Sequence, residues 1–182
     1  MGDGCRVTGM TPPVERDLQG DGMANGEIVL YGTEILKKTT REVDPAEPGL
    51  QELVEHMYQV MHDAPGVGLA ANQIGVDKQI FVYDVGDGPS VLLNPRIVRR
   101  RGSQVAIEGC LSVPGLQGDV RRASHVIAEG QDLDGNKIQI KAEGLLARVF
   151  QHEIDHLNGF LFIDRADPDT LTLVSPDEQE EE

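Results

Sequence analysis

The chain has 182 residues, a length typical of one domain, and its 39% hydrophobic residues are enough to build one core, filled by aliphatic side chains because Trp is absent. A formal net charge of −15 argues against a surface that binds nucleic acid or anionic membranes. Two cysteines, Cys5 and Cys110, are too few for a disulfide framework, so we expect a reducing, cytoplasmic compartment. No apolar run approaches the ~20 residues of a membrane span, and the N-terminus lacks the pattern of a signal or transit peptide.

The two ends of the chain differ in composition from the part between them. Residues 1–26 contain many glycines and no apolar periodicity, so we expect a flexible or extended lead-in, with Met23 as an alternative start. Residues 169–182 are expected to form an acidic, solvated C-terminal tail, because carboxylates dominate its last positions: Asp177, Glu178, Glu180, Glu181 and Glu182. Residues 27–168 carry the periodic patterns and are predicted to form a single domain.

Along this domain, the first strong pattern predicts an amphipathic helix over residues 49–63. Pro65 and Gly66 end it, and its apolar residues recur at three- and four-residue spacing: Leu50, Leu53, Val54, Met57, Tyr58 and Met61. His56 and His62 belong to this helix and are expected to be surface residues.

Short β-rich runs follow, at residues 80–83, 91–93, 126–128 and 137–140. The last two flank Asp134-Gly135, a dipeptide typical of a β-hairpin turn. Helical spacing returns from Gly144 and continues to a C-cap at Asn158-Gly159. The expected fold is therefore α+β, with antiparallel β-sheets packed around a central C-terminal helix.

That helix contains His152-Glu153-Ile154-Asp155-His156, which reads H-E-x-x-H. Residues four apart share a helical face, so both imidazoles can reach one metal ion, and Glu153 can contact a bound water as general base. A solvated polar stretch of helix is the alternative. The apolar periodicity before the motif and the cap after it favour the metal site.

A third protein ligand decides the class of metallohydrolase. One group of metalloproteases extends the motif to H-E-x-x-H-x-x-G-x-x-H, and this chain matches it as far as Gly159 but carries Phe162 at the last position. Another group uses a later glutamate, but the glutamates that follow His156 here lie in the terminal acidic run. The protease interpretation therefore lacks a third ligand.

Cys110 is the upstream candidate, in the segment Glu108-Gly109-Cys110-Leu111-Ser112. A lone cysteine is commonly a small buried apolar residue. Beside two histidines, however, a thiolate leaves a fourth coordination position open for water, which is the pattern of a catalytic site. His125 competes for the role, although it falls in a predicted strand with no partner.

The segment Gly66–Gly75 is rich in glycine and alanine. It is either a turn that caps the preceding helix or a backbone that approaches a ligand closely, with the Gln73 amide as its polar group. No phosphate-loop lysine follows, and the chain offers no direct nucleic-acid-binding motif.

Three segments together resemble the peptide deformylase family, which is marked by G-x-G-L-A-A-x-Q, E-G-C-L-S and H-E-x-D-H in this order. They occur here at Gly66–Gln73, Glu108–Ser112 and His152–His156, without a departure at the marked positions. The resemblance runs over roughly residues 28–165. It implies that residues 27–168 form a catalytic metallohydrolase domain, which would remove the N-formyl group from the first methionine of new proteins.

The resemblance also implies the cofactor, the partner and the roles of the site residues. One divalent ion, ferrous iron in the family and zinc, nickel or cobalt as alternatives in a purified sample, would be held by Cys110, His152 and His156. Glu153 would be the general base. The donors to the carbonyl oxygen would be the Gln73 side chain and the Leu111 backbone N–H. The N-formylated peptide emerging from the ribosome would contact Val67, Gly68, Gly109, Leu145 and Val149.

Three positions depart from what other members carry. Arg148 occupies a pocket-lining position that is apolar in some of them, and Gln117 stands where some have an arginine near the peptide. Some bacterial members end in a basic helix that docks on the ribosome, whereas this chain ends in carboxylates. The alternatives to a deformylase are an aminopeptidase or endopeptidase with the same H-E-x-x-H motif, and a non-catalytic binding module that kept a structural metal.

Overall fold

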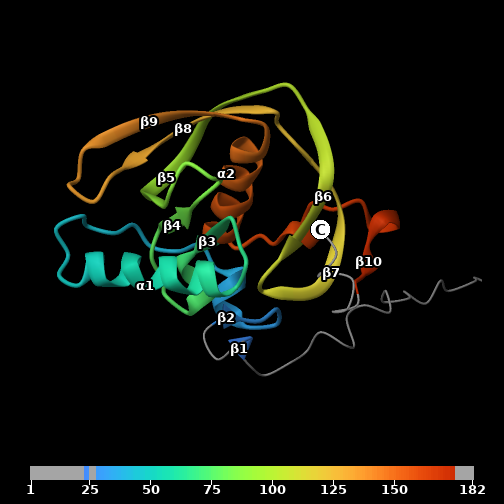
Figure 1. Cartoon of the computed structure of the whole chain (residues 1–182), viewed down its shortest axis with the longest axis horizontal. Helices are drawn as coiled ribbons and strands as arrows, with labels where there is room; N and C mark the ends of the chain where they lie inside the picture. The colour runs from blue at the N-terminus through green and yellow to red at the C-terminus, as the bar shows by residue number, and fades with distance from the viewer. Residues whose placement is uncertain (1–22, 25–27, 175–182) are drawn as a thin grey trace, which may run out of the picture.

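Two antiparallel β-sheets lie on either side of one central helix (Figure 1). The computed structural model describes residues 23–24 and 28–174. The central helix is α2 (Gly144–Leu157), and a second helix, α1 (Leu50–Asp63), lies outside the larger sheet. This arrangement confirms the predicted α+β fold with a central C-terminal helix.

The larger sheet has five strands in the order β3-β4-β5-β8-β9, all antiparallel. Their bounds are Gly68–Ala70, Ile80–Tyr83, Ser90–Arg101, His125–Gln131 and Lys137–Glu143. The second sheet has the order β10-β7-β6, with bounds Thr172–Leu173, Val113–Arg122 and Gln104–Cys110. A two-stranded sheet joins β1 (Met23–Ala24) to β2 (Ile28–Val29). Short 3₁₀-helices are η2 (Glu34–Lys37), η3 (Ala71–Ile74), η4 (Phe162–Asp164) and η5 (Pro168–Thr170).

Both faces of the larger sheet contribute to the core. On the inner face, Phe150 of α2 meets Phe81 of β4 edge to face, with ring centroids 5.2 Å apart, in a cluster that includes Leu92 and Ala128. On the outer face, α1 buries four residues of the predicted stripe, Leu50, Val54, Met57 and Met61, together with Val60, whereas Leu53 and Tyr58 are partly buried. The sheet therefore holds α2, and the motif it carries, by aliphatic and aromatic packing from one side.

The strands agree less well with the sequence-based prediction than the helices do. The strand expected at residues 91–93 is the start of β5, which continues to Arg101. Pro95 lies within this strand, at the point where the pairing with β8 shifts register between Leu93 and Arg96. Such an irregularity tolerates a residue without an N–H.

Strands β3, β6 and β7 were not predicted. The glycine-rich segment, interpreted as either a capping turn or a backbone close to a ligand, contains β3 followed by η3. Strand β7 contains a proline and two glycines, which read as a turn in sequence, yet it pairs with β6 over nearly its whole length. Tertiary pairing overrides local propensity here.

The terminal boundaries remain predictions, because residues 1–22, 25–27 and 175–182 lie outside the described residues. Met23 and Ala24 of the expected lead-in pair with β2. The last two residues of η5 and the whole of β10 fall inside the range assigned to the tail, and β10 pairs with β7 at Leu116 and Gln117. Strand pairing therefore continues past the expected domain boundary. Within the described ranges, no helix is long and apolar enough to cross a membrane.

The end of α2 depends on Gly159, which adopts a φ of +81°. A Cβ there would approach the carbonyl carbon and oxygen of Lys37 to 2.7 Å. Gly49 has nearly the same φ, +80°, but a Cβ built there would have no atom within 4 Å.

We expect Gly49→Ala to lower the free energy of unfolding by ~1–2 kcal/mol through backbone strain alone, and Gly159→Ala to lower it by clearly more. Urea unfolding of both variants measures the difference; equal losses would show that the contact with Lys37 costs nothing.

Candidate active site

The histidines of the H-E-x-x-H motif meet Cys110 at one point between the two sheets. His152 and His156 lie one turn apart on α2, and their Nε2 atoms are 3.2 Å apart. The Cys110 Sγ, at the end of β6, lies 3.2 Å from the His156 Nε2. One ligand atom from each of the three residues falls within 4.8 Å of the others. The structure thus brings together the three residues expected to bind metal.

The donor set fits a divalent metal ion. His152 directs its Nδ1 to the Glu108 Oε2 at 3.0 Å, which leaves its Nε2 facing the other two donors. A carboxylate behind a ligating histidine is the usual way that proteins fix ring orientation, and one thiolate with two imidazoles leaves a position open. The other histidines lie elsewhere: His56 and His62 are exposed on α1, as expected, and the competing candidate His125 contacts Ser124 and Glu143.

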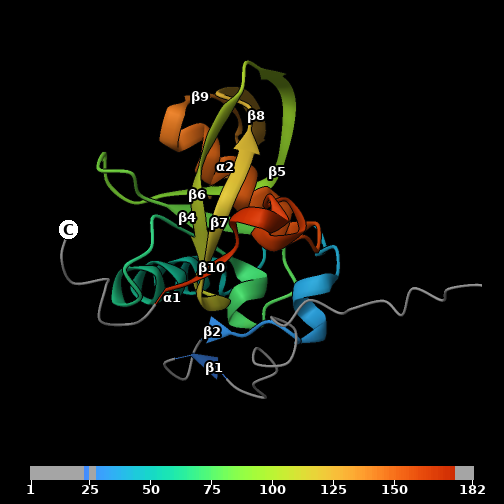
Figure 2. The same ribbon diagram turned by 90° about the vertical axis from the view of Figure 1, so that its right-hand side faces the viewer.

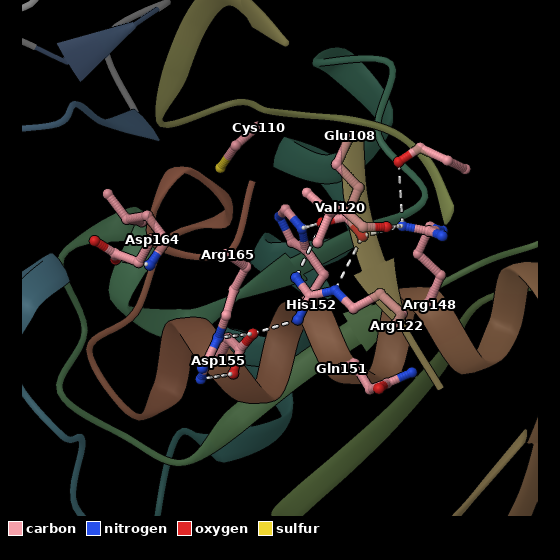
Figure 3. Close-up of polar contacts among 12 residues, drawn as sticks. Glu108, Cys110, Val120, Arg122, Arg148, Gln151, His152, Asp155, Asp164 and Arg165 are labelled. Carbon is pink, nitrogen blue, oxygen red and sulfur yellow. Dashed lines mark hydrogen bonds and ion pairs between the residues drawn. The ribbon is translucent and has the colours of Figure 1, made fainter. Parts of the chain in front are cut away.

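Glu108 is the centre of a buried ion-pair network around His152 (Figure 3). Arg122 of β7 donates two hydrogen bonds to its carboxylate, at 3.0 Å each, and Arg148 of α2 donates a third. Asp155 then accepts hydrogen bonds from both Arg122 and the half-exposed Arg165. Burial by itself would raise the pKa of Glu108, but the hydrogen bonds from His152 and Arg122 lower it to about 2.

The same network explains why a charged residue, Arg148, stands at a position that is apolar in some other members. Its guanidinium Nη1 donates to Glu108 and to the Val120 carbonyl at 3.1 Å, and the side chain is only 9% exposed. Arg148 lines the cleft described below, as its place in the sequence suggested, but its charge is directed at the carboxylate behind His152. A polar residue at this position is therefore compatible with an apolar pocket.

Glu153 lies in the cleft wall and is 4% exposed. Burial raises its pKa to about 7, the range in which a carboxylate can both accept and return a proton. Gly68 of β3 runs directly beside it: a Cβ on Gly68 would lie 2.5 Å from the Glu153 Oε1 and 3.0 Å from Val149. The glycine-rich segment thus provides a close approach of the backbone to the buried carboxylate.

Gln73 has its amide fixed in one orientation. Its Oε1 accepts a hydrogen bond from the Ala70 N–H at 2.9 Å, so its Nε2 faces Ser112 Oγ at 3.3 Å and Cys110 Sγ at 3.6 Å. The side chain is 2% exposed. An amide N–H group therefore points at the Cys110 side of the site.

A cleft of about 640 Å³ opens over these groups, a volume typical of small-molecule sites. Cys110, His152 and Glu153 lie in its wall together with Gln73 and Leu111, whereas His156 is fully buried behind them. The five residues expected to contact the peptide all line it: Val67, Gly68, Gly109, Leu145 and Val149.

Several lining and supporting residues were not anticipated from the sequence. Glu108 and Asp155 stood inside the two motifs without an assigned role, and Arg122 carried no signal at all. Ile107, 62% exposed on β6, and Val174, next to β10, also line the cleft. No alternating pattern pointed to Ile107, because residues 105–107 of β6 are all exposed.

A cleft that places a buried carboxylate beside one thiol and two imidazoles supports metal-assisted hydrolysis, and it defines the chain as a metal-dependent hydrolase. Residues 26–171 match the family model described as polypeptide deformylase. The chain is 50% identical over 145 residues to the peptide deformylase of Carboxydothermus hydrogenoformans, covering 80% of this chain and 95% of that protein. Among curated relatives, peptide deformylase 1 of Clostridium acetobutylicum is 47% identical over 143 residues, 79% of this chain and 95% of the relative.

Solved structures give the same result. The peptide deformylase of Legionella pneumophila superposes with a TM-score of 0.75 at 43% identity, covering 78% of this chain and 86% of that one. The peptide deformylase of Thermotoga maritima also superposes with a TM-score of 0.75, at 40% identity, and the match covers 78% of this chain and 97% of that one. The chain belongs to the peptide deformylase family, the metal-dependent hydrolases that remove the N-formyl group from new polypeptides.

The carboxylate behind His152 should govern how firmly a metal ion is held. We expect Glu108→Gln to weaken metal binding by about 10–100-fold, because the neutral amide offers one acceptor oxygen in place of two, leaves the buried Arg148 without its counter-ion and leaves Arg122 with Asp155 alone. Competition with a chelator measures the affinity. Glu129→Gln is the matched control, since Glu129 pairs with Arg96 at the surface of the other sheet. Equal metal affinity in the two variants would contradict the role given to Glu108.

Proposed function

We propose that this chain hydrolyses the N-formyl group of N-terminal formyl-methionine through Glu153 as general base, at a metal ion held by Cys110, His152 and His156. The observation that carries the proposal is the thiol of Cys110 beside the two histidines of α2, in a cleft that also contains the buried Glu153. The metalloprotease alternatives lack this support, because Phe162, at the position of their third histidine, is buried in the core.

The expected ion is ferrous iron, with zinc, nickel or cobalt as substitutes in a purified sample. A thiolate with two imidazoles suits iron or zinc, and availability decides between ions of similar affinity. When bound, such an ion lowers the pKa of a coordinated water and polarises a carbonyl group.

Glu153 moves the proton in the proposed mechanism. It accepts a proton from the attacking water and returns it to the leaving amine as the C–N bond breaks, which releases formate. Its pKa of about 7 suits both steps. Two further donors act on the carbonyl oxygen as it becomes negative: the Gln73 side-chain amide, held by the Ala70 N–H, and the Leu111 backbone N–H.

The substrate backbone fits along β6, one of the two edge strands of its sheet. A peptide can add to such an edge by main-chain hydrogen bonds, and Gly109 of β6 presents no side chain to it; at Gly68 the missing side chain leaves room for Glu153. Val67, Leu145 and Val149 form the apolar wall proposed to receive the methionine side chain. The proposed partners are N-formylated nascent peptides emerging from the ribosome, and the proposed compartment is the cytoplasm, where these peptides are made.

The decisive comparison uses two peptides. The proposal predicts release of formate from formyl-Met-Ala-Ser and no release of amino acids from Met-Ala-Ser.

Glu153→Gln should lower formate release by ~10²–10⁴-fold while metal content stays unchanged, because the carboxylate acts on the water without holding the ion. Glu55→Gln, an exposed change on α1, is the control. Near-full activity of Glu153→Gln with metal in place would contradict the mechanism, and amino-acid release by the wild type would favour a peptidase.

Cys110 should make the enzyme sensitive to oxygen. A ferrous ion with an open position reacts with oxygen, and its thiolate ligand can be oxidised. We therefore expect aerobic samples to lose activity with time and nickel or cobalt substitution to protect them. Cys110→Ser should lose metal and activity together, whereas Cys5→Ser should lose neither. Metal analysis and formate release with and without oxygen test this; unchanged metal content in Cys110→Ser would refute the ligand assignment.

A further inference from the structure

One exposed apolar side chain in the wall of the catalytic cleft has no role in the proposed function. Three large apolar residues of this wall are substantially exposed: Val67 at 46%, Leu145 at 55% and Ile107 at 62%. Val67 and Leu145 belong to the wall proposed for the methionine side chain, whereas Ile107 lies on β6 and is not part of it. An apolar side chain left open to water inside a substrate cleft points to a contact with the substrate.

Strand β6 directs its side chains to two sides of the second sheet in alternation. Glu108 faces α2, because its carboxylate contacts His152 and Arg148 of that helix. Its neighbours Ile107 and Gly109 therefore face the other side, which we call the solvent side. Figure 2 shows β6 and β7 with α2 behind them. Both Ile107 and Gly109 line the cleft, so the cleft extends over the solvent side of β6.

Strand β7 adds two polar side chains to the solvent side. Residues paired directly across antiparallel strands share a face, and here Gly109 pairs with Gln117 and Ile107 pairs with Asp119. Val120, the residue after Asp119, is buried, which agrees with this alternation. Because Gly109 has no side chain, the space above it is bordered by Ile107, Gln117 and Asp119.

The carboxylate of Asp119 has no cationic partner within residues 28–174. The backbone of Asp119 is fixed, since its N–H donates to the Thr170 hydroxyl at 2.9 Å and its carbonyl accepts from the Asp167 N–H at 2.9 Å. Arg121 lies two residues further along β7 on the same face, but its guanidinium donates to the Ser103 hydroxyl at 3.3 Å, in the turn before β6. A positive charge on the substrate can therefore approach Asp119 without displacing a partner.

The proposed position of the peptide sends its second side chain to this space. The formyl group lies at Cys110, where β6 ends, so the peptide runs antiparallel to β6, from Gly109 toward Ile107. The methionine side chain faces α2, because Leu145 and Val149 belong to that helix. Alternation along an extended peptide then directs the following side chain away from α2, to the solvent side of β6.

We infer that Ile107 and Asp119 select lysine or arginine as the residue that follows formyl-methionine, an inference that rests on the proposed function. The aliphatic stem of a basic side chain packs on Ile107, and its charged end extends across β6 toward the Asp119 carboxylate. Aspartate and glutamate are disfavoured at this position, because like charges on neighbouring strands repel one another. Both residues act on binding of the peptide, so their effect belongs to KM rather than to kcat.

Steady-state kinetics of the full-length, metal-loaded protein on formyl-Met-Xaa-Ser test the inference, with lysine, norleucine, alanine or glutamate as Xaa. Norleucine has the aliphatic stem of lysine without its charge. We expect kcat/KM for the lysine peptide to exceed that for the glutamate peptide by roughly five- to tenfold, mainly through KM. This ratio should shrink as salt is raised from about 50 to about 500 mM, because salt screens exposed charges. We expect norleucine to exceed alanine by roughly threefold, because its longer stem is partly buried on Ile107.

Two variants separate the charge from the apolar contact. Asp119→Asn should lower the lysine-to-glutamate ratio and remove its salt dependence, while the norleucine-to-alanine ratio persists. Ile107→Ser should lower the norleucine-to-alanine ratio and keep the salt dependence. Asp134→Asn, an exposed change in the turn between β8 and β9, is the matched control and should alter neither ratio. Ratios measured within one variant cancel any general loss of folded or metal-loaded protein.

Equal kcat/KM values for the lysine and glutamate peptides, with formate released from both, would overturn the inference and leave the proposed function intact. The same conclusion would follow if Asp119→Asn kept the full preference for lysine over glutamate, or if Ile107→Ser kept the full preference for norleucine over alanine. Absence of formate release from all four peptides would instead contradict the proposed function, and the inference with it.

Discussion

The buried carboxylate of Glu108 is the interaction on which the catalytic site depends. It joins β6 to α2 through His152 and Arg148, and it joins both to β7 through Arg122. Each partner comes from an element that also lines or supports the cleft. A carboxylate buried among two arginines and a histidine is costly to leave without any one of them, so the elements are held in one relative position. The orientation of the His152 ring follows from this geometry.

The same constraint explains why the cleft can remain open. The inner face of the larger sheet fixes α2 by apolar packing from one side, and Glu108 fixes it from the other by charge. Neither interaction requires side chains in the space above Cys110 and Glu153. Glycine at position 68 completes the arrangement, because any side chain there would collide with Glu153. Stability thus comes from contacts around the site, and the cleft itself is left free for a peptide.

The parts of this architecture that sequence could predict are those with local signals. Both helices have apolar residues at helical spacing and clear end signals, and both lie where they were expected. The convergence of Cys110 with His152 and His156 was expected from motif chemistry and family resemblance, since nothing local relates a cysteine to histidines over 40 residues away. Strand β7 could not be predicted, because its proline and glycines are compatible with pairing only in the presence of β6 and β10. Arg122, which β7 carries, was missed for the same reason.

Within the hydrolases that use H-E-x-x-H, the central claim is that a cysteine thiolate completes the metal site. X-ray absorption on the zinc-loaded protein tests it most directly, because sulfur and nitrogen ligands differ in distance. The account predicts one sulfur at about 2.3 Å and two imidazole nitrogens at about 2.0–2.1 Å from the metal. A spectrum that requires only nitrogen and oxygen neighbours would contradict the assignment of Cys110.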